Sequence, residues 1–189
     1  MAFINVSKNT KKIKTEEADM SLFLKLFKIY MVMALLFLSS VIHSDTIKKP
    51  IVIYKQLILS ASKNKVWSAL TENKELSKWW NKGVRLEPFF GGQFYEPWGE
   101  GQLATGKVLE LKKMDSITFT WHEKYWKKYE NTKCTFTLKE LSGTTVLEVR
   151  HSGWEIFKDS EKRARLVKGF RKGWDDLLPK LKKHIELSH

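Results

Sequence analysis

The residues that could perform acid–base or metal chemistry are few and scattered. The histidines are His43, His122, His151, His184 and His189. No two of them stand at the spacing of a metal-binding pair, which argues against a zinc site. No serine stands in a G-x-S-x-G turn, and no glycine-rich phosphate loop is present. His151 and Glu123 are the groups that could act singly as an acid or a base, because the adjacent pair His122-Glu123 points to opposite faces of a strand. The sequence therefore predicts no catalytic constellation, no metal and no cofactor.

Large aromatic side chains are the more prominent feature. The chain of 189 residues holds eight Trp, eleven Phe and five Tyr, which suits a cavity lined by rings as well as a packed core. Strand alternation places Phe119 and Trp121 on one face and His151 on a face with Leu147 and Val149. One imidazole among rings would orient an amphipathic ligand, or it would simply hydrogen-bond the backbone. We expect the ligand-binding residues to be Trp80, Phe94, Trp98, Phe119, Trp121, His151, Trp154, Phe170 and Trp174.

A segment from Trp121 to Tyr129 interleaves basic and aromatic residues. Such a segment can lie at a membrane interface, with rings at the depth of the head groups and lysines on phosphates. It can also stack single-stranded bases, or form a solvated hairpin tip that shields a cavity mouth. The predicted membrane or partner contacts are Lys124, Tyr125, Trp126, Lys127 and Lys128.

Charge and cysteine content narrow the class of protein. Lys and Arg number 34 against 21 Asp and Glu, a formal charge of +13. This excess favours an anionic partner, and of the two candidates we expect a lipid surface rather than nucleic acid. Cys134 is the only cysteine, which excludes an intrachain disulfide or a CxxC redox motif.

The elements that must position these residues follow from hydrophobic periodicity. Apolar residues at odd positions of residues 51–59 predict a strand, and two short helices follow, one capped by Ser62 and one over Lys74–Trp79. A helical stripe from Ala164 to Ile185 predicts one long C-terminal helix, with Asp159 or Ser160 as its cap. Between them come strand-like runs with short turns, which means an antiparallel meander. The predicted strands are Val84–Pro88, Gln93–Trp98, Gly106–Leu111, Ser116–His122, Thr132–Leu141 and Thr144–Ser152.

The first 44 residues read as a leader, and residues 45–189 as the domain. Lys25 and Lys28 precede the uncharged run Ile29 to Ile42, and Ser44 is a small residue at a possible cleavage point. This pattern is typical of a secretory signal peptide that starts at Met20, although retention as a membrane anchor is an open alternative. We expect the protein to be exported to the periplasm or the extracellular space if the leader is cleaved, and membrane-anchored otherwise.

The order of elements and several short motifs resemble a known family. The stretches Val66–Thr71, Trp79-Trp80, Pro88–Phe94 and His151–Trp154, together with Gly106–Glu110, Phe119–Trp121 and Gly173-Trp174, look like the domain named after the activator of the heat-shock-protein-90 ATPase. That domain belongs to the START-like (SRPBCC, birch-pollen-allergen-like) superfamily. The resemblance implies an α+β helix-grip fold, in which an antiparallel sheet of about seven strands wraps around the long helix.

The resemblance also implies a function. Members of the START-like superfamily commonly enclose a hydrophobic cavity between the sheet and the helix, and only some of them are enzymes. We therefore expect the protein to bind or carry a small apolar or amphipathic ligand. The alternatives are a protein-interaction module of the chaperone-activator kind and an enzyme of the cyclase or hydrolase type that uses His151 or Glu123. The sequence leaves the ligand's identity and the oligomeric state open.

Overall fold

The computed structural model describes residue 20 and residues 23–33 and 49–187. The chain divides into two units, residues 1–49 and 50–189, and each is considered by itself. In the first unit residues 23–33 are helical. None of the helices in the described ranges is long and apolar enough to cross a membrane. Most of the predicted leader, including the cleavage point near Ser44, lies outside the described residues, so the leader and the export that it implies stay predictions.

The second unit is a seven-stranded antiparallel sheet and one long helix. The sheet order is β1-β7-β6-β5-β4-β3-β2. The strands from β2 to β7 follow one another as a meander, and the last strand, β7, pairs with β1. Two short helices, α2 (Lys63–Thr71) and α3 (Asn73–Trp79), follow β1, and α4 (Ser160–Leu187) closes the chain. The strands are β1 (Ile53–Leu59), β2 (Arg85–Leu86), β3 (Gln93–Gly99), β4 (Gln102–Lys112), β5 (Ser116–Glu123), β6 (Thr132–Leu141) and β7 (Thr144–Ser152).

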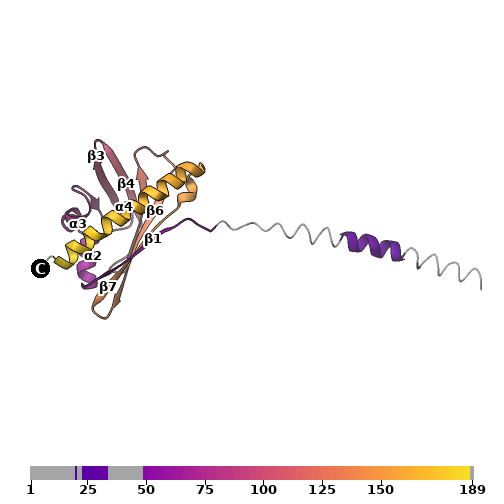
Figure 1. Ribbon diagram of the computed structural model, residues 1–189, viewed down its shortest axis with the longest axis horizontal. Coiled ribbons are helices and arrows are strands. Elements are labelled where there is room, and N and C mark those ends of the chain that lie inside the picture. The colour runs from indigo at the N-terminus through magenta and orange to yellow at the C-terminus, as the bar shows by residue number, and fades with distance from the viewer. Residues whose placement is uncertain (1–19, 21–22, 34–48, 188–189) are drawn as a thin grey trace, which may run out of the picture. The chain divides into compact units, whose positions relative to one another are not determined.

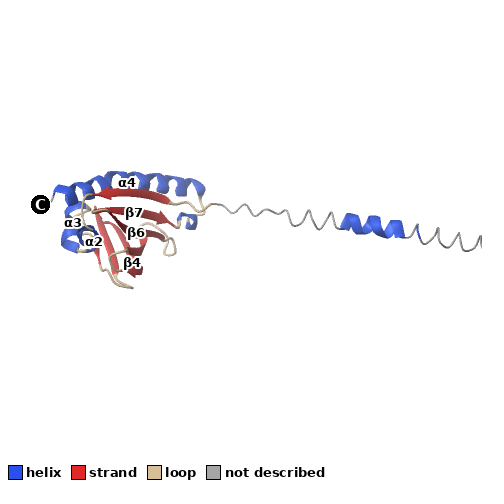
Figure 2. Cartoon of the chain, turned by 90° about the horizontal axis from the view of Figure 1, so that it is seen from below, coloured by secondary structure: helices blue, strands red, loops and turns tan. Residues whose placement is uncertain are grey.

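The long helix lies along one face of the sheet (Figures 1 and 2). Its buried residues Trp174, Leu178, Leu181 and Ile185 recur at steps of three and four, as expected for a helix with one apolar face. Asp159 caps its start, since its Oδ1 accepts hydrogen bonds at 2.9 Å from the backbone amides of two residues in the first turn. The predicted helix-grip fold is thus confirmed.

Two details of the meander differ from the expected boundaries. The strand expected to begin at Gly106 begins at Gln102, because the turn before it is tighter than expected. Gly99, Glu100 and Gly101 all have positive φ angles, between 50° and 85°, which brings β3 directly back into β4. The strand predicted over Val84–Pro88 is shorter in the structure, where β2 has only two residues. These shifts leave the order of the elements unchanged.

Candidate ligand cavity

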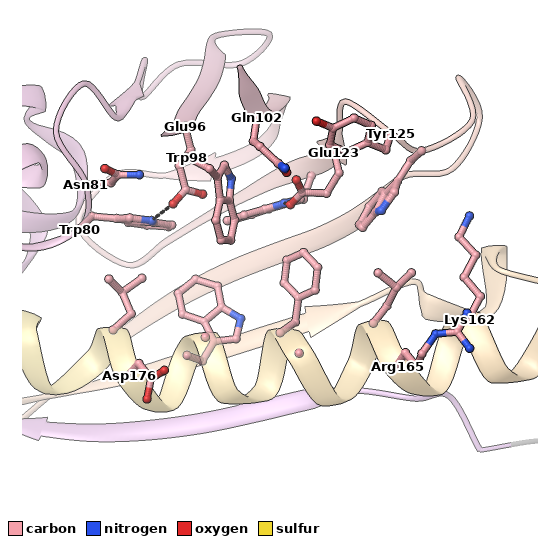
Figure 3. Close-up of a pocket in the computed structure, with 18 of the residues that line it drawn as sticks. Trp80, Asn81, Glu96, Trp98, Gln102, Glu123, Tyr125, Lys162, Arg165 and Asp176 are labelled. Atoms are coloured by element: carbon pink, nitrogen blue, oxygen red, sulfur yellow. Dashed lines mark hydrogen bonds between the residues drawn. The ribbon is translucent and has the colours of Figure 1, made fainter. Parts of the chain in front are cut away.

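A cavity of about 810 Å³ lies between the sheet and α4. Its walls come from the C-terminal end of α3, from β3, the start of β4 and β5, from the turn after β5 and from α4, as Figure 3 shows. A volume in this range is typical of small-molecule sites. Its aromatic lining consists of Trp80, Trp98, Trp121, Tyr125, Trp126, Phe170 and Trp174.

The rings of the wall support one another by aromatic contacts. The Trp80 and Trp121 rings are stacked with centroids 6.1 Å apart, and the Trp174 ring meets Trp80 edge-on at 5.6 Å. Phe170 meets Trp121 edge-on, also at 5.6 Å. Offset and edge-to-face pairs are favourable arrangements of aromatic rings. The contacts therefore make the inner wall a preformed apolar surface.

Two glycines on α4 leave room on the helix side. Gly169 and Gly173 stand four residues apart, which places them on one face of the helix, and both line the cavity. A Cβ atom added at either position would have no heavy atom within 4 Å, apart from the helix's own backbone and immediate neighbours. Glycine inside a helix is about 1 kcal/mol less favourable than alanine. The helix thus carries two unfavourable residues where they widen the cavity.

Of the nine predicted ligand-binding residues, five line the cavity and four do not. Trp80, Trp98, Trp121, Phe170 and Trp174 bound it. The other four are core residues with at most 1% of their surface exposed, and they pack behind the wall: Phe94, Phe119, His151 and Trp154. Strand alternation correctly identified the inward faces, but it could not separate rings that reach the cavity from rings that support them.

His151 is a structural residue in this arrangement. Its Nε2 lies 2.7 Å from Thr132 Oγ1, and its Nδ1 accepts from Trp174 Nε1 at 3.3 Å. Because Nδ1 accepts, Nε2 carries the proton and donates to the threonine. Complete burial lowers the pKa of His151 to about 3, so the ring is neutral at ordinary pH. Both nitrogens are occupied, so the role of His151 is to orient Trp174 rather than to exchange protons with a ligand.

Glu96 is the residue that the sequence reasoning missed. It lies on β3, lines the cavity and is only 4% exposed. Its Oε1 accepts a hydrogen bond at 2.6 Å from Trp80 Nε1, as Figure 3 shows. Burial, reinforced by the nearby charge of Glu123, raises the pKa of Glu96 to about 8, against the opposing effect of the Trp80 hydrogen bond. The detectable signal was a carboxylic acid at the inward position of the alternating run Phe94, Glu96, Trp98.

Glu123, at the end of β5, faces the same cavity. Its Oε1 accepts from Trp121 Nε1 at 2.7 Å, and burial raises its pKa. The neighbouring His122 points elsewhere and contacts the Glu130 carbonyl oxygen through Nδ1 at 2.9 Å. The side chains of His122 and Glu123 thus contact different groups. Two carboxyl groups, each held by an indole N–H, stand in one aromatic cavity.

The basic and aromatic segment after β5 divides between the surface and the interior. Tyr125 is 65% exposed and Lys128 is exposed, whereas Trp126 is 8% exposed and packs on Phe157 with ring centroids 4.8 Å apart. Lys124 donates to the Gly101 carbonyl oxygen at 3.0 Å. Lys127 Nζ lies 5.9 Å from the centre of the Tyr129 ring. Tyr125 and Trp126 therefore both line the cavity, whereas Lys124, Lys127 and Lys128 belong to the surface turn beside it.

Charged residues of α4 occupy the rim of the cavity. They are Lys162, Arg165, Asp176 and Lys180. Lys162 is paired with Glu130 at 2.9 Å. Within the described ranges, no group of three or more His, Cys, Asp or Glu side chains is arranged to hold a metal ion.

Comparison with known proteins places this geometry in a family. The family model described as "Activator of Hsp90 ATPase homolog 1-like protein" matches residues 60–186. Among solved structures, protein MLL2253 from Mesorhizobium loti is similar with a TM-score of 0.64 and 21% identity, over 74% of this chain and 99% of that one. The Aha1 dimer from Colwellia psychrerythraea has a TM-score of 0.61 and 21% identity, over 72% and 97%.

A protein from Bacillus halodurans is also similar, with a TM-score of 0.60 and 24% identity, over 72% of this chain and 97% of that one. At such identities the structural likeness shows the fold alone. A search of the curated proteins finds no match.

Proposed function

Since the chain belongs to the family of activator of Hsp90 ATPase homolog 1-like proteins, with the START-like helix-grip fold, we propose that it binds one small, largely apolar molecule between the sheet and α4. The observation that carries this proposal is the cavity of about 810 Å³ lined by aromatic rings. An interaction module without a ligand would have no need of such a space, because filling it with side chains would stabilise the fold.

The glycines of α4 support the same conclusion. Replacing Gly169 and Gly173 by alanine would favour the helix and meet no steric obstacle in the structure. A fold without a ligand has no evident reason to keep both. The exposed rings at the cavity mouth, Trp98 and Tyr125, are 52% and 65% exposed. Together with Lys124 and Lys128 they support exchange of the ligand with an anionic membrane surface.

Native mass spectrometry of the full-length chain, expressed with its leader and repeated after organic extraction, tests this proposal. We expect a co-purifying apolar molecule that leaves on extraction, and a phospholipid among the extracted molecules would support contact with a membrane. The same spectrum gives the mass of the chain, and a product that starts near Asp45 would support export. A chain that is empty and also takes up nothing from lipid extracts would contradict ligand binding and favour the interaction module.

A second candidate function is proton transfer on the bound ligand. It is favoured by Glu96 and Glu123, two carboxyl groups in one cavity whose pKa values are both raised by burial. Pairs of this kind divide into an acid and a base when their environments separate the two pKa values. Glu123 would remove a proton from a carbon atom next to a carbonyl group, while Glu96 would donate its proton to the carbonyl oxygen to form the enol.

Deuterium exchange tests this second function. With 2-acetylnaphthalene in D₂O, we expect the methyl protons to exchange faster in the presence of the protein, with the acceleration lost in Glu123→Gln. NMR measures the rate. Equal rates with and without the protein would contradict proton transfer and leave binding as the function.

A further inference from the structure

One oxygen of Glu96 has no partner. Oε1 accepts from Trp80 Nε1, but Oε2 is buried and makes no hydrogen bond with any residue that the structure describes. The nearby Asn81 amide donates to the Pro97 carbonyl oxygen. Asn81 also acts on the Glu96 carboxyl group and lowers its pKa against the larger effect of burial, but it makes no hydrogen bond with Oε2. Buried polar atoms in folded proteins are nearly always hydrogen-bonded, so an exception calls for an explanation. Glu96 lines the cavity, so a ligand bound in the cavity can be the missing hydrogen-bond partner of Oε2.

The protonation state decides what Oε2 offers to a ligand. Burial raises the pKa of Glu96 to about 8, so the carboxyl group is mostly protonated at neutral pH. Trp80 donates to Oε1, which therefore acts as the acceptor of the group, and the acid proton belongs on Oε2. The cavity wall thus presents an O–H donor without an acceptor.

We propose that the ligand carries an uncharged carbonyl group, as in a ketone, ester or amide, whose oxygen accepts a hydrogen bond from Glu96. The apolar body of the ligand then lies against the rings of Trp80, Trp121 and Trp174. This inference rests on the proposed function and specifies the chemistry of the molecule that the cavity selects. A hydrocarbon would leave the donor unpaired, whereas a carbonyl group satisfies it.

The main competitor is an organic cation, because aromatic faces beside carboxyl groups can also hold an ammonium group. The charges around the cavity argue against it. Glu96 interacts electrostatically with Glu123 on β5 and Cys134 on β6. The other titratable or charged groups that line the cavity are Tyr125 in the turn after β5 and Lys162, Arg165, Asp176 and Lys180 on α4. Burial keeps the pKa of the Cys134 thiol well above its usual value, so it stays neutral. At the helix rim Lys162 is paired with Glu130, Arg165 with Glu161 and Asp176 with Lys172. Lys180 adds a further positive charge at this rim, which disfavours a cation.

Trp98 is a neighbour of Glu96 in the cavity wall. This residue stands two positions after Glu96 on β3, beside it in Figure 3, and it is 52% exposed. Oε2 itself is covered in the empty cavity. A carbonyl oxygen therefore reaches Oε2 only when a neighbouring side chain of the wall shifts.

Three isosteric probes test the inference by calorimetric titration at pH 6.5 and 9.5. They are 2-acetylnaphthalene, 2-isopropenylnaphthalene, in which a CH₂ group replaces the carbonyl oxygen, and 1-(2-naphthyl)ethylamine as the cation. At pH 6.5 we expect the folded chain to bind the ketone about tenfold more tightly than the alkene, as the pairing of a buried donor predicts. At pH 9.5 the ionised Glu96 cannot donate, and the advantage of the ketone should disappear.

The variant Glu96→Gln removes the titration but keeps a donor. Its amide oxygen can accept from Trp80 while its N–H group donates to the ligand, so the preference for the ketone should persist at both pH values. Glu140→Gln makes the same change at an exposed position of β6 outside the cavity, so it is the matched control. In this variant the advantage of the ketone should still disappear between pH 6.5 and 9.5.

Equal affinity for ketone and alkene at pH 6.5 would overturn the inference while leaving apolar ligand binding intact. The inference is also overturned if the amine binds best and loses affinity in Glu96→Gln. If neither the ketone nor the alkene binds, the proposed function itself fails for ligands of this size, and the inference fails with it.

Discussion

Replacing Glu96 by glutamine is expected to raise the free energy of unfolding by about 3 kcal/mol at pH 7. The folded protein holds this carboxyl group with a pKa of about 8, against a value of 4.5 for an unperturbed group. Between these two values the unfolded chain loses its proton while the folded chain keeps it. The unfolded state therefore binds fewer protons, and the stability of the wild type falls as the pH rises from 4.5 to 8. Glutamine does not titrate, and it can keep the hydrogen bond from Trp80.

Urea unfolding of both proteins between pH 5 and 8.5 measures this effect. The difference between variant and wild type should be small near pH 5 and should grow until the pH exceeds about 8. His151 does not disturb the comparison above pH 6.5. Its pKa is lowered to about 3 in the fold, so it weakens the fold only as the pH falls below its unperturbed value of 6.5.

Glu140→Gln is the control for a general effect of removing a negative charge from a basic protein. Glu140 is exposed on β6, so its substitution should give little stabilisation. A difference between Glu96→Gln and wild type that does not change with pH would show that the carboxyl group of Glu96 ionises normally in the fold.

Filling the cavity from the helix should abolish ligand binding without harming the fold. In Gly173→Leu the new side chain would enter the empty space beside Gly173 and occupy the volume between α4 and the rings of the sheet. We expect the affinity for 2-acetylnaphthalene to fall by about a hundredfold or more, since a filled site excludes the ligand sterically. The melting temperature should stay the same or rise, because leucine favours a helix over glycine by nearly 1 kcal/mol.

Two variants make this result interpretable. Gly173→Ala adds a single methyl group, so it should bring most of the gain in helix stability and a smaller loss of affinity. Lys168→Leu places the same leucine at a position of α4 that does not line the cavity, and it should leave binding unchanged. Calorimetric titration and thermal unfolding measure both properties. Unchanged affinity in Gly173→Leu would show that ligands do not enter this cavity.

The order of elements in this protein was predictable from local patterns. The helical stripe from Ala164 to Ile185 and the strand alternation around Trp121 each repeat a period that a short stretch of chain displays by itself. The family motifs added the packing of the sheet around the long helix, because their order along the chain matched the helix-grip arrangement. What local patterns missed was the start of β4, where three successive residues with positive φ angles, one of them not glycine, form a tight turn.

The candidate site was only half predictable, for a physical reason. Sequence period indicates which way Phe119, Trp121 and His151 point, but not how far α4 stands from the sheet. That separation decides that Trp121 faces empty space while Phe119 and His151 are enclosed behind it. Glu96 shows the same limit. The sequence reveals that it is a carboxylic acid at an inward position of the strand, but not its environment in the fold. Its burial, its raised pKa and its unpartnered oxygen arise only when Trp80, 16 residues earlier in the chain, packs against it.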